Sequence, residues 1–218
     1  AYRLKQILST LTPSPKLPKA QGDFQPFKDF IKAKKLKPGD IAIDCGAGIG
    51  EIAEVMATCG AQVYAFEPNP YAYQVLCNRL AQYPNAHLIS KGVYTQNGAA
   101  RLYLHKQADE DPVKWSTASS LLAFKKNVNP ETFVEIELID LAQFILNLKQ
   151  DVKVLKMDVE GIECAIVNHL IDSAAIQRIR CLLVETHDNR IPELKEETDA
   201  LRRRIQREGW RNVNLDWY

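Results

Sequence analysis

The feature that most constrains this chain is an apolar strand that leads into a glycine-rich turn, followed by a helix and a second strand that ends in an acid. The first part reads I-A-I-D-C-G-A-G-I-G over residues 41–50, and the second reads V-Y-A-F-E-P-N-P over residues 63–70. Glycines allow a ligand to approach the backbone closely, and an acid after the second strand can bind both hydroxyls of a ribose. The pattern therefore predicts a nucleoside-binding pocket.

The turn itself indicates which nucleoside is bound. A dinucleotide-binding turn usually reads G-x-G-x-x-G and directs a helix N-terminus at a pyrophosphate, whereas this turn reads G-A-G-I-G and follows Asp44. An acid beside the turn repels a pyrophosphate but suits a cofactor with an ammonium and a sulfonium group. Glycine turns also occur without ligands, and Glu67 strengthens the ligand interpretation. We therefore expect S-adenosylmethionine rather than NAD.

Composition and charge limit the class of protein. A chain of 218 residues with 46% hydrophobic content predicts one α/β domain over residues 1–218, preceded by a proline-containing arm at residues 1–22. Its 28 basic and 27 acidic residues give a formal charge of +1, from which we expect neither a nucleic-acid nor a membrane partner. No apolar run approaches the roughly 20 residues of a membrane span. Five cysteines without a C-x-x-C pair favour a reduced, cytoplasmic protein.

Hydrophobic periodicity predicts alternating strands and helices. Strands are expected at residues 87–94, 101–104, 133–138, 152–157, 180–185 and 212–215, in addition to the two above. Helices are expected near residues 24–31, 50–59, 70–82 and 161–171 and from Pro192 to Gly209, with a polar loop at 105–129. Near-continuous apolar runs at 152–157 and 180–185 are typical of central parallel strands covered on both faces.

A second cluster, L-K-M-D-V-E-G-I-E over residues 155–163, follows one of these central strands. Ligands of open α/β sheets bind at the carboxyl ends of the strands. Strand alternation places Lys156, Asp158 and Glu160 on one side, and charges enter a buried strand only with partners. The spacing indicates an internal ion pair or a chemical site, and for Lys156 the two interpretations are equally favoured.

Together these motifs resemble the FkbM family of S-adenosylmethionine-dependent methyltransferases. The resemblance rests on D-C-G-A-G-I-G, A-F-E-P-N-P, the Ser119-Ser120 pair, L-K-M-D-V-E-G-I-E and L-L-V-E-T-H, in this order over about residues 38–190. It implies a class I, Rossmann-like three-layer sandwich with a mostly parallel sheet and room for an antiparallel C-terminal strand. It also implies methyl transfer to an oxygen, commonly on a sugar or natural product.

The resemblance further implies where the cofactor binds. The residues expected to contact it are Asp44, Gly46, Ala47, Gly48, Gly50, Glu67, Pro68, Asn69, Gly92, Val93 and Asp158. Asp44 and the glycines would border the methionine part, and Glu67 would hold the ribose. The segment around Gly92 would lie by the adenine, although it offers no acid for the exocyclic amine.

Methyl transfer to a hydroxyl needs a group that accepts its proton. Candidates are Asp158 and Glu160 after one strand and Glu185 and His187 after the next. Histidine titrates nearest to neutrality, so His187 and Asp158 are preferred. The same four side chains could hold a magnesium or manganese ion, but we favour base catalysis without a metal. Glu163 is expected only to favour the start of the following helix.

The loop at residues 105–129 is expected to lie above the sheet edge and contact the acceptor, a small hydroxylated molecule. Trp115 could stack on a sugar ring or tuck the loop down, and Ser119 and Ser120 could bind hydroxyls or cofactor. A nicotinamide-dependent oxidoreductase and a non-catalytic nucleoside-binding module remain alternatives. The sequence leaves open the acceptor, the oligomeric state, with a homodimer among the options, the role of the arm, and whether the chain belongs to a longer protein.

Overall fold

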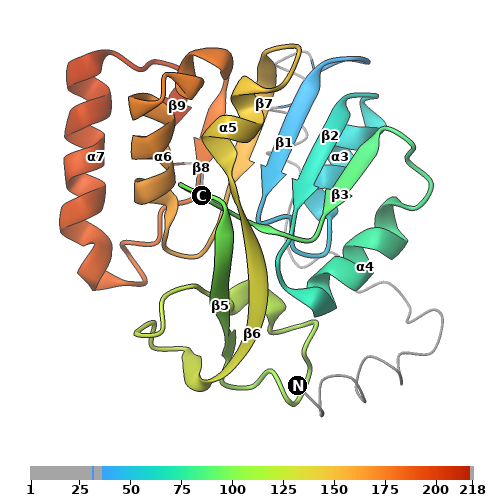
Figure 1. The fold of residues 1–218 in the computed structure, drawn as a ribbon, viewed down its shortest axis with the longest axis vertical. Helices are drawn as coiled ribbons and strands as arrows, with labels where there is room; N and C mark the ends of the chain where they lie inside the picture. Colours follow the sequence, from blue (N-terminus) through green and yellow to red (C-terminus); the bar gives the residue numbers. More distant parts are fainter. Residues whose placement is uncertain (1–30, 32–35, 217–218) are drawn as a thin grey trace.

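The main feature of the fold is a six-stranded sheet with the strand order β3-β2-β1-β7-β8-β9, in which every neighbouring pair is parallel (Figure 1). The computed structural model describes residue 31 and residues 36–216. The strands are β1 (Ile41–Cys45), β2 (Gln62–Phe66), β3 (Ala86–Ile89), β7 (Val152–Met157), β8 (Leu182–Val184) and β9 (Val213–Asn214). The predicted arm and the predicted helix near 24–31 fall outside the described residues, except for Ile31, which is helical and buried.

Both faces of this sheet are covered by helices, so successive residues of a central strand enter different cores. Ile43 of β1 packs into a core with helices α5 (Leu141–Leu146) and α6 (Glu163–Asp172). Its neighbour Ala42 packs into a second core with α3 (Glu51–Thr58) and α4 (Pro70–Leu80). The continuous apolar runs follow from burial on both faces. The predicted α/β three-layer sandwich is confirmed.

The C-terminal end of the chain adds one more helix and one more strand. The 3-10 turn η3 (Pro192–Leu194) leads into α7 (Lys195–Glu208), and Gly209 ends this helix in the left-handed region. The resemblance left room for an antiparallel C-terminal strand, but β9 pairs with β8 in parallel, and among the described residues beside these strands only the isolated Glu185–Asp216 bridge is antiparallel. A helix as long as α7 returns the chain to the start of β8, which makes a parallel pairing available.

A second, three-stranded sheet lies beyond the carboxyl ends of the central strands (Figure 1). It has the order β4-β6-β5, with β4 (Gly92–Tyr94), β5 (Gly98–His105) and β6 (Val128–Asp140). The prediction of one strand at 87–94 was wrong, because the chain breaks after Ile89 and places β3 and β4 in different sheets. The antiparallel β5–β6 hairpin, with the short helix η1 (Ser116–Ala118) in its connection, forms a wall above the central sheet.

Local sequence signals explain where the site-bearing elements begin. Asn69 caps α4, because its side chain accepts from the N–H of Tyr71 and Pro70 occupies the first helical turn.

Among the described helices, none is long and apolar enough to cross a bilayer. Among the described residues the five cysteines form no disulfide.

Candidate active site

The glycine turn after β1 lies directly against the end of β7. Gly46, Gly48 and Gly50 all have positive φ angles, of 74°, 55° and 89°. A Cβ atom added to Gly46 would lie 1.8 Å from the carbonyl oxygen of Asp158, so only glycine allows this approach. Gly50 serves packing instead, because its added Cβ would meet the side chain of Leu76 on α4 at 2.6 Å. The turn therefore joins β1, β2 and β7 at one edge.

Glu67, at the end of β2, is held in a fixed orientation beside this turn. One carboxylate oxygen accepts from the N–H of Gly48 at 2.7 Å, and the other accepts from the N–H of Asn69 at 2.8 Å. Burial raises the pKa of Glu67 to about 7, although these two backbone donors oppose the shift. The Asn69 amide donates to the hydroxyl of Ser119 at 3.1 Å and so ties the long loop to α4.

A pocket of about 660 Å³, part of it open to solvent, lies over the turn. Many residues that the sequence predicted for a site line it: Gly46, Gly48, Glu67, Pro68, Asn69, Gly92, Val93, Ser119, Asp158 and Glu160. The sequence analysis missed the remaining lining residues: Phe66, Leu102, Ser116, Leu121, Ile136, Val159 and Ile162. Several of these missed residues come from the β5–β6 hairpin and its connection, which lie far from the motifs in the sequence and carry no motif of their own.

Other predicted residues do not line this pocket. Asp44 is fully buried behind the turn, while Ala47 packs with α3 and Gly50 packs against α4. Trp115 stacks on His105 with the two ring centroids 4.3 Å apart, which fits the interpretation that it tucks the loop down. Ser120 donates to the carbonyl oxygen of Glu160 at 2.6 Å and so fastens the loop to the end of β7.

Lys156 connects the glycine turn after β1 to the residues that follow β7. Its ammonium group donates to the carbonyl oxygen of Gly46 at 2.8 Å and lies 3.3 Å from Asp44 Oδ1 and 3.7 Å from Asp158 Oδ2. Burial lowers the pKa of Lys156, but the two carboxylates outweigh burial and raise it above its ordinary value. Lys156 is therefore a charged internal partner beneath the pocket.

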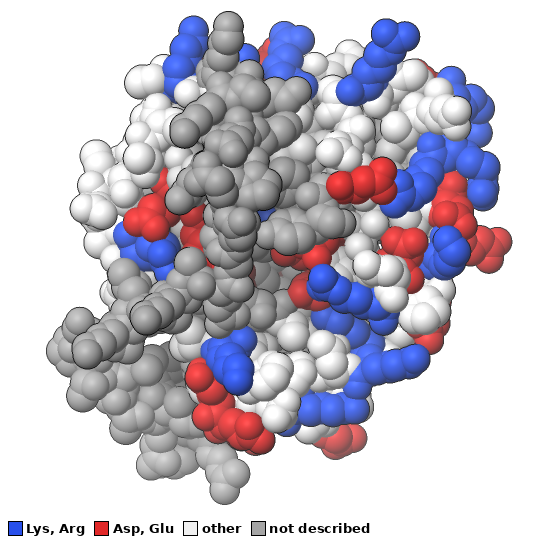
Figure 2. Space-filling view, turned by 180° about the vertical axis from the view of Figure 1, so that it is seen from behind, with Lys and Arg blue, Asp and Glu red and all other residues white. Residues whose placement is uncertain are grey.

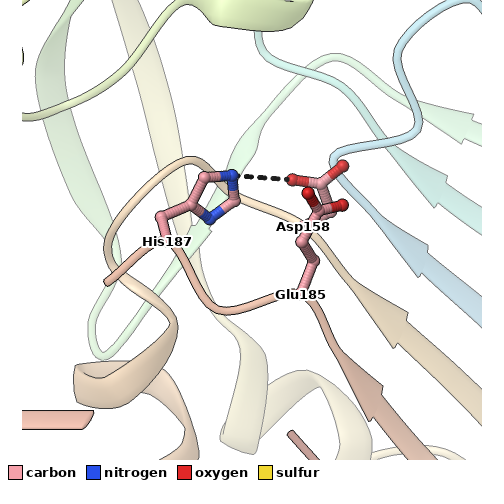
Figure 3. A group of neighbouring side chains, drawn as sticks. All are labelled: Asp158, Glu185 and His187. Atoms are coloured by element: carbon pink, nitrogen blue, oxygen red, sulfur yellow. Dashed lines mark ion pairs between the residues drawn. The ribbon is translucent and has the colours of Figure 1, made fainter. Parts of the chain in front are cut away.

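Three of the predicted catalytic residues converge at the ends of β7 and β8 (Figure 3). Each of Asp158, Glu185 and His187 offers one ligand atom, and these atoms lie within 4.8 Å of one another. His187 Nε2 lies 3.6 Å from Asp158 Oδ1 and faces that carboxylate in Figure 3. The imidazole is 1% exposed, and neither ring nitrogen has a partner with hydrogen-bond geometry among the described residues.

Acidic neighbours surround the imidazole of His187. Its Nδ1 lies 2.9 Å from Glu163 Oε1, and its Nε2 lies 3.4 Å from Glu160 Oε2. Burial lowers the pKa of His187, but the contact with Glu163 and the charges of Glu160 and Asp158 raise it to about 9. Glu163 also accepts from the N–H groups of Val159 and Gly161, so it both fastens the start of α6, as the sequence predicted, and contacts His187.

The fourth predicted residue, Glu160, is held by a lysine that the sequence analysis missed. Glu160 has a φ of 62°, unusual for a residue other than glycine, and its carboxylate pairs with the buried Lys125. Lys125 also donates to the carbonyl oxygen of Ala118 at 3.1 Å. No local pattern distinguishes Lys125 from Lys126, because only the packing of the loop buries the first and exposes the second.

A second, more polar pocket adjoins the first at this point. Its lining consists of Ala118, Lys125, Lys126, Asn127, Asp158, Glu160, Glu185 and Arg190. Asp158 and Glu160 line both pockets. The site therefore has a largely apolar compartment over the glycine turn and a charged compartment beside the His187 cluster, and these two carboxylates lie between them.

A comparison with models of known protein families shows the family of this chain. The model of the methyltransferase FkbM domain matches residues 44–211, from the acid before the glycine turn to the segment after α7. The chain belongs to the FkbM methyltransferase family. The match includes all the motifs on which the sequence resemblance rested, so that resemblance is confirmed.

Curated relatives of this FkbM methyltransferase domain match a shorter segment. The ribosomal RNA small subunit methyltransferase A of Thermotoga maritima is 39% identical over 61 residues, which are 28% of this chain and 22% of that protein. The protein of the same name from Lactobacillus johnsonii is 35% identical over 60 residues, 28% of this chain and 20% of that protein. The chain thus matches less than a quarter of the length of these relatives.

Solved structures show a broader but weaker likeness. An rRNA methylase from Streptococcus thermophilus has a TM-score of 0.47 and 13% identity, covering 86% of this chain and 81% of that chain. A SAM-dependent O-methyltransferase from Thermotoga maritima has a TM-score of 0.43 and 13% identity, covering 90% of this chain and 55% of that chain.

The sequence-based exclusion of a nucleic-acid partner was wrong, because relatives that share the 61-residue segment are named for ribosomal RNA. The exclusion used a formal charge of +1, which is a sum over the whole chain and does not describe any one surface. Figure 2 shows basic and acidic side chains interspersed on one face. In the arginine run of α7, Arg202 pairs with Asp216 and Arg204 pairs with Asp172.

Proposed function

We propose that this protein is an S-adenosylmethionine-dependent O-methyltransferase that methylates a hydroxyl of a small molecule, such as a sugar or a sugar-bearing product. One observation carries the proposal: Asp158 lines both the apolar compartment over the glycine turn and the charged compartment beside it. A group at that position can contact the methyl donor in one compartment and the methyl acceptor in the other. The family membership supports methyl transfer as the reaction.

The first compartment fits the proposed cofactor. Glu67 still has acceptor capacity after its two backbone contacts, because each carboxylate oxygen can accept more than one hydrogen bond, so it can take a ribose diol. Apolar side chains of Phe66, Val93 and Ile136 suit an adenine ring. When bound, S-adenosylmethionine supplies an activated methyl group on a positively charged sulfur, and the carboxylates of Asp158 and Glu160, which line this pocket, favour a positive charge there.

The residues of the chain then have two tasks, orientation and proton removal. The charged compartment holds the acceptor hydroxyl next to Asp158, and exclusion of water by the β5–β6 wall keeps the two reactants together. Orientation contributes up to about 7–11 kcal/mol in well-aligned reactions, while a general base contributes a factor of about 10²–10⁴. Asp158 is our first choice for the proton acceptor because it lines both compartments, and His187 is the second.

The lining of the charged compartment supports a hydroxylated acceptor. Lys125, Asn127 and Arg190 offer donors, and Glu185 offers an acceptor, so a polyol can form hydrogen bonds on several sides. A second candidate acceptor is RNA, which the names of the relatives favour. The two candidates differ in size, since a polyol fits inside the compartment whereas RNA must also contact the outer surface.

The test combines binding with transfer. Calorimetric titration should show S-adenosylmethionine binding with a stoichiometry of one, while NADH gives no heat. Transfer of a labelled methyl group is then measured to a panel of glycosides and, separately, to total RNA. The proposal expects label in a glycoside and its loss on Asp158→Asn. His169→Gln, which alters an imidazole that pairs with Asp140 on the far side of α6, is the control.

Each contrary outcome has a definite meaning. Heat with NADH but none with S-adenosylmethionine would identify a nicotinamide enzyme. Label in RNA alone would move the acceptor to the second candidate. Cofactor binding without transfer to any acceptor, unchanged by Asp158→Asn, would indicate a non-catalytic nucleoside-binding module.

A further inference from the structure

We propose that Asp158, Glu185 and His187 form a binding site for one divalent cation of the magnesium or manganese type, which positions the acceptor hydroxyl. This inference rests on the proposed function and reverses the preference for metal-free catalysis that the sequence suggested. The three residues follow two neighbouring parallel strands, β7 and β8, so their side chains reach the same point from fixed backbone positions (Figure 3). A site on strand ends is more rigid than one on loops.

The strongest evidence is the imidazole of His187. It is 1% exposed, and its Nε2 has no partner with hydrogen-bond geometry among the described residues, although it lies 3.4 Å from Glu160 Oε2 and 3.6 Å from Asp158 Oδ1. A buried polar atom without a partner is costly and calls for an explanation. Asp158 Oδ1, the atom it faces, is also buried and unpartnered. Two unpartnered ligand atoms facing each other at this separation are what two ligands of a shared ion look like in its absence.

The geometry is compatible with a small hard cation. Opposite ligands of a magnesium ion lie about 4.2 Å apart, since each bond is about 2.1 Å long. Only one pair among three ligands can be opposite, and adjacent ligands lie about 3 Å apart. The three ligand atoms of the cluster lie within 4.8 Å of one another, so their separations must shrink by up to about 2 Å when they bind the ion. Two carboxylates and one imidazole, without a thiolate, favour magnesium or manganese.

The surroundings of His187 and Glu160 decide which residues are ligands. Glu163 contacts the other ring nitrogen of His187 at 2.9 Å, which is the arrangement that orients a histidine ligand. Glu160 is not counted as a ligand, because Lys125 already pairs with its carboxylate. Glu185 and His187 both follow β8, so the segment after this strand supplies two of the three ligands.

The charge balance of the region also favours a divalent cation. Five carboxylates lie in this connected network against three permanent cations, which leaves two negative charges when His187 is neutral and one when it is protonated. The carboxylates are Asp44, Asp158, Glu160, Glu163 and Glu185, and the cations are Lys125, Lys156 and Arg190.

Three protein ligands leave positions open on the ion for oxygens of the acceptor. A hydroxyl oxygen that coordinates the cation becomes more acidic, as metal-bound water does. Asp158 and His187, the two choices of proton acceptor without a metal, are then both ligands, so Glu160, which lines both compartments, replaces them as the proton acceptor. The O–H bond breaks, the O–CH₃ bond forms as the CH₃–S bond breaks, and the products are a methyl ether, protonated Glu160 and the neutral thioether of the cofactor.

The test uses Mn²⁺ alone as the probe, so it does not depend on turnover. Protein freed of metal with EDTA and dialysed is titrated with Mn²⁺, and the signal of free Mn²⁺ is followed by electron paramagnetic resonance. The wild-type chain should bind one Mn²⁺. His187→Gln and Glu185→Gln should each weaken binding at least about tenfold, because each removes one ligand, and Glu163→Gln about 10- to 100-fold because it releases the orientation of His187.

His169→Gln is the matched control, because it alters an imidazole that also pairs with a carboxylate, Asp140, at 3.0 Å. It should bind Mn²⁺ as the wild-type chain does. If His187→Gln fails to fold, Glu185→Gln still decides the question, since Glu185 is only partly buried. Absence of stoichiometric Mn²⁺ binding, or equal binding by all variants, would overturn the inference. The cluster would then be explained by a protonated His187 that pairs with the surrounding carboxylates.

Calorimetric titration with S-adenosylmethionine in EDTA separates the two proposals. Cofactor binding without Mn²⁺ binding would overturn the cation site and leave the proposed function standing. Mn²⁺ binding without cofactor binding would overturn the proposed function and leave the cation site standing.

Discussion

Replacing Lys156 by methionine tests how the floor of the site is held together. Lys156 is 6% exposed and contacts three partners, namely Asp44, Asp158 and the carbonyl oxygen of Gly46. Methionine keeps most of the volume of the side chain but removes the charge and all donors. Asp44 depends on Lys156 for charge compensation, because its side chain is 0% exposed to solvent and Lys156 is its only ion-pair partner among the described residues.

The magnitude follows from the burial of this pair. Removing one partner of a buried ion pair costs about 3–5 kcal/mol, since the remaining charge stays buried without compensation. In a chain of this size each kcal/mol lowers Tm by about 2–4 °C, so Lys156→Met should lower Tm by about 6–20 °C. The double variant Asp44→Asn/Lys156→Met should recover part of that loss, because it also removes the stranded charge.

Urea denaturation and differential scanning calorimetry of the wild-type chain, the two single variants and the double variant provide the measurement. Calorimetric titration with S-adenosylmethionine should also show weaker binding by Lys156→Met, because the glycine turn loses the donor to the Gly46 carbonyl oxygen. A Tm within about 2 °C of the wild-type value, or additive losses in the double variant, would refute the argument that Lys156 compensates Asp44.

Three further predictions concern the cofactor compartment. Glu67→Gln should weaken S-adenosylmethionine binding about 10- to 100-fold, measured by calorimetry, because a neutral amide replaces a carboxylate acceptor. A change below threefold would contradict a contact between Glu67 and the ribose. Burial raises the pKa of Glu67 from 4.5 to about 7, so the folded chain holds a proton that the unfolded chain has lost, and the Glu67 contribution to stability falls as pH rises from 4.5 towards 7. Scanning fluorimetry should show the Tm of Glu67→Gln gaining on the wild-type value over that interval, and a constant difference would contradict the shift. Gly46→Ala should destabilise the fold by about 2–5 kcal/mol, because Gly46 has a left-handed φ and the added Cβ would clash with Asp158. Gly98→Ala is the control and should leave stability unchanged, since an added Cβ meets nothing there. Equal urea midpoints for the two variants would contradict the close approach of Gly46 to Asp158.

The sequence predicted much of the central sheet and of the site edge. Residues 152–157 form a strand with the predicted bounds, and the apolar run before the glycine turn forms β1, because runs of apolar residues flanked by turn residues are a local signal. Asp158, Glu185 and His187 were candidates after two strands, and the carboxyl ends of neighbouring parallel strands meet at one edge, but their convergence within 4.8 Å came from the structure. The exclusion of a nucleic-acid partner from the net charge was wrong, because a net charge carries no information on where the charges lie.

Other features could not be read from local patterns. The break between β3 and β4 depends on which sheet each segment joins, and the direction of β9 depends on where α7 returns the chain. The preference against a metal also came from the sequence, which offers no means to see that His187 Nε2 lacks a hydrogen-bond partner.

The sequence by itself determined the order of strands and helices, the glycine turn and the acids that end β2, β7 and β8, because each depends on residues within a few positions of one another. Only the tertiary structure decided that the β5–β6 hairpin walls the pocket, that Lys125 reaches Glu160 across 35 residues, and that His187 is buried facing Asp158. These features arise from packing between segments distant in sequence. Packing depends on the shapes of all the surfaces in contact, which no local pattern of residues encodes.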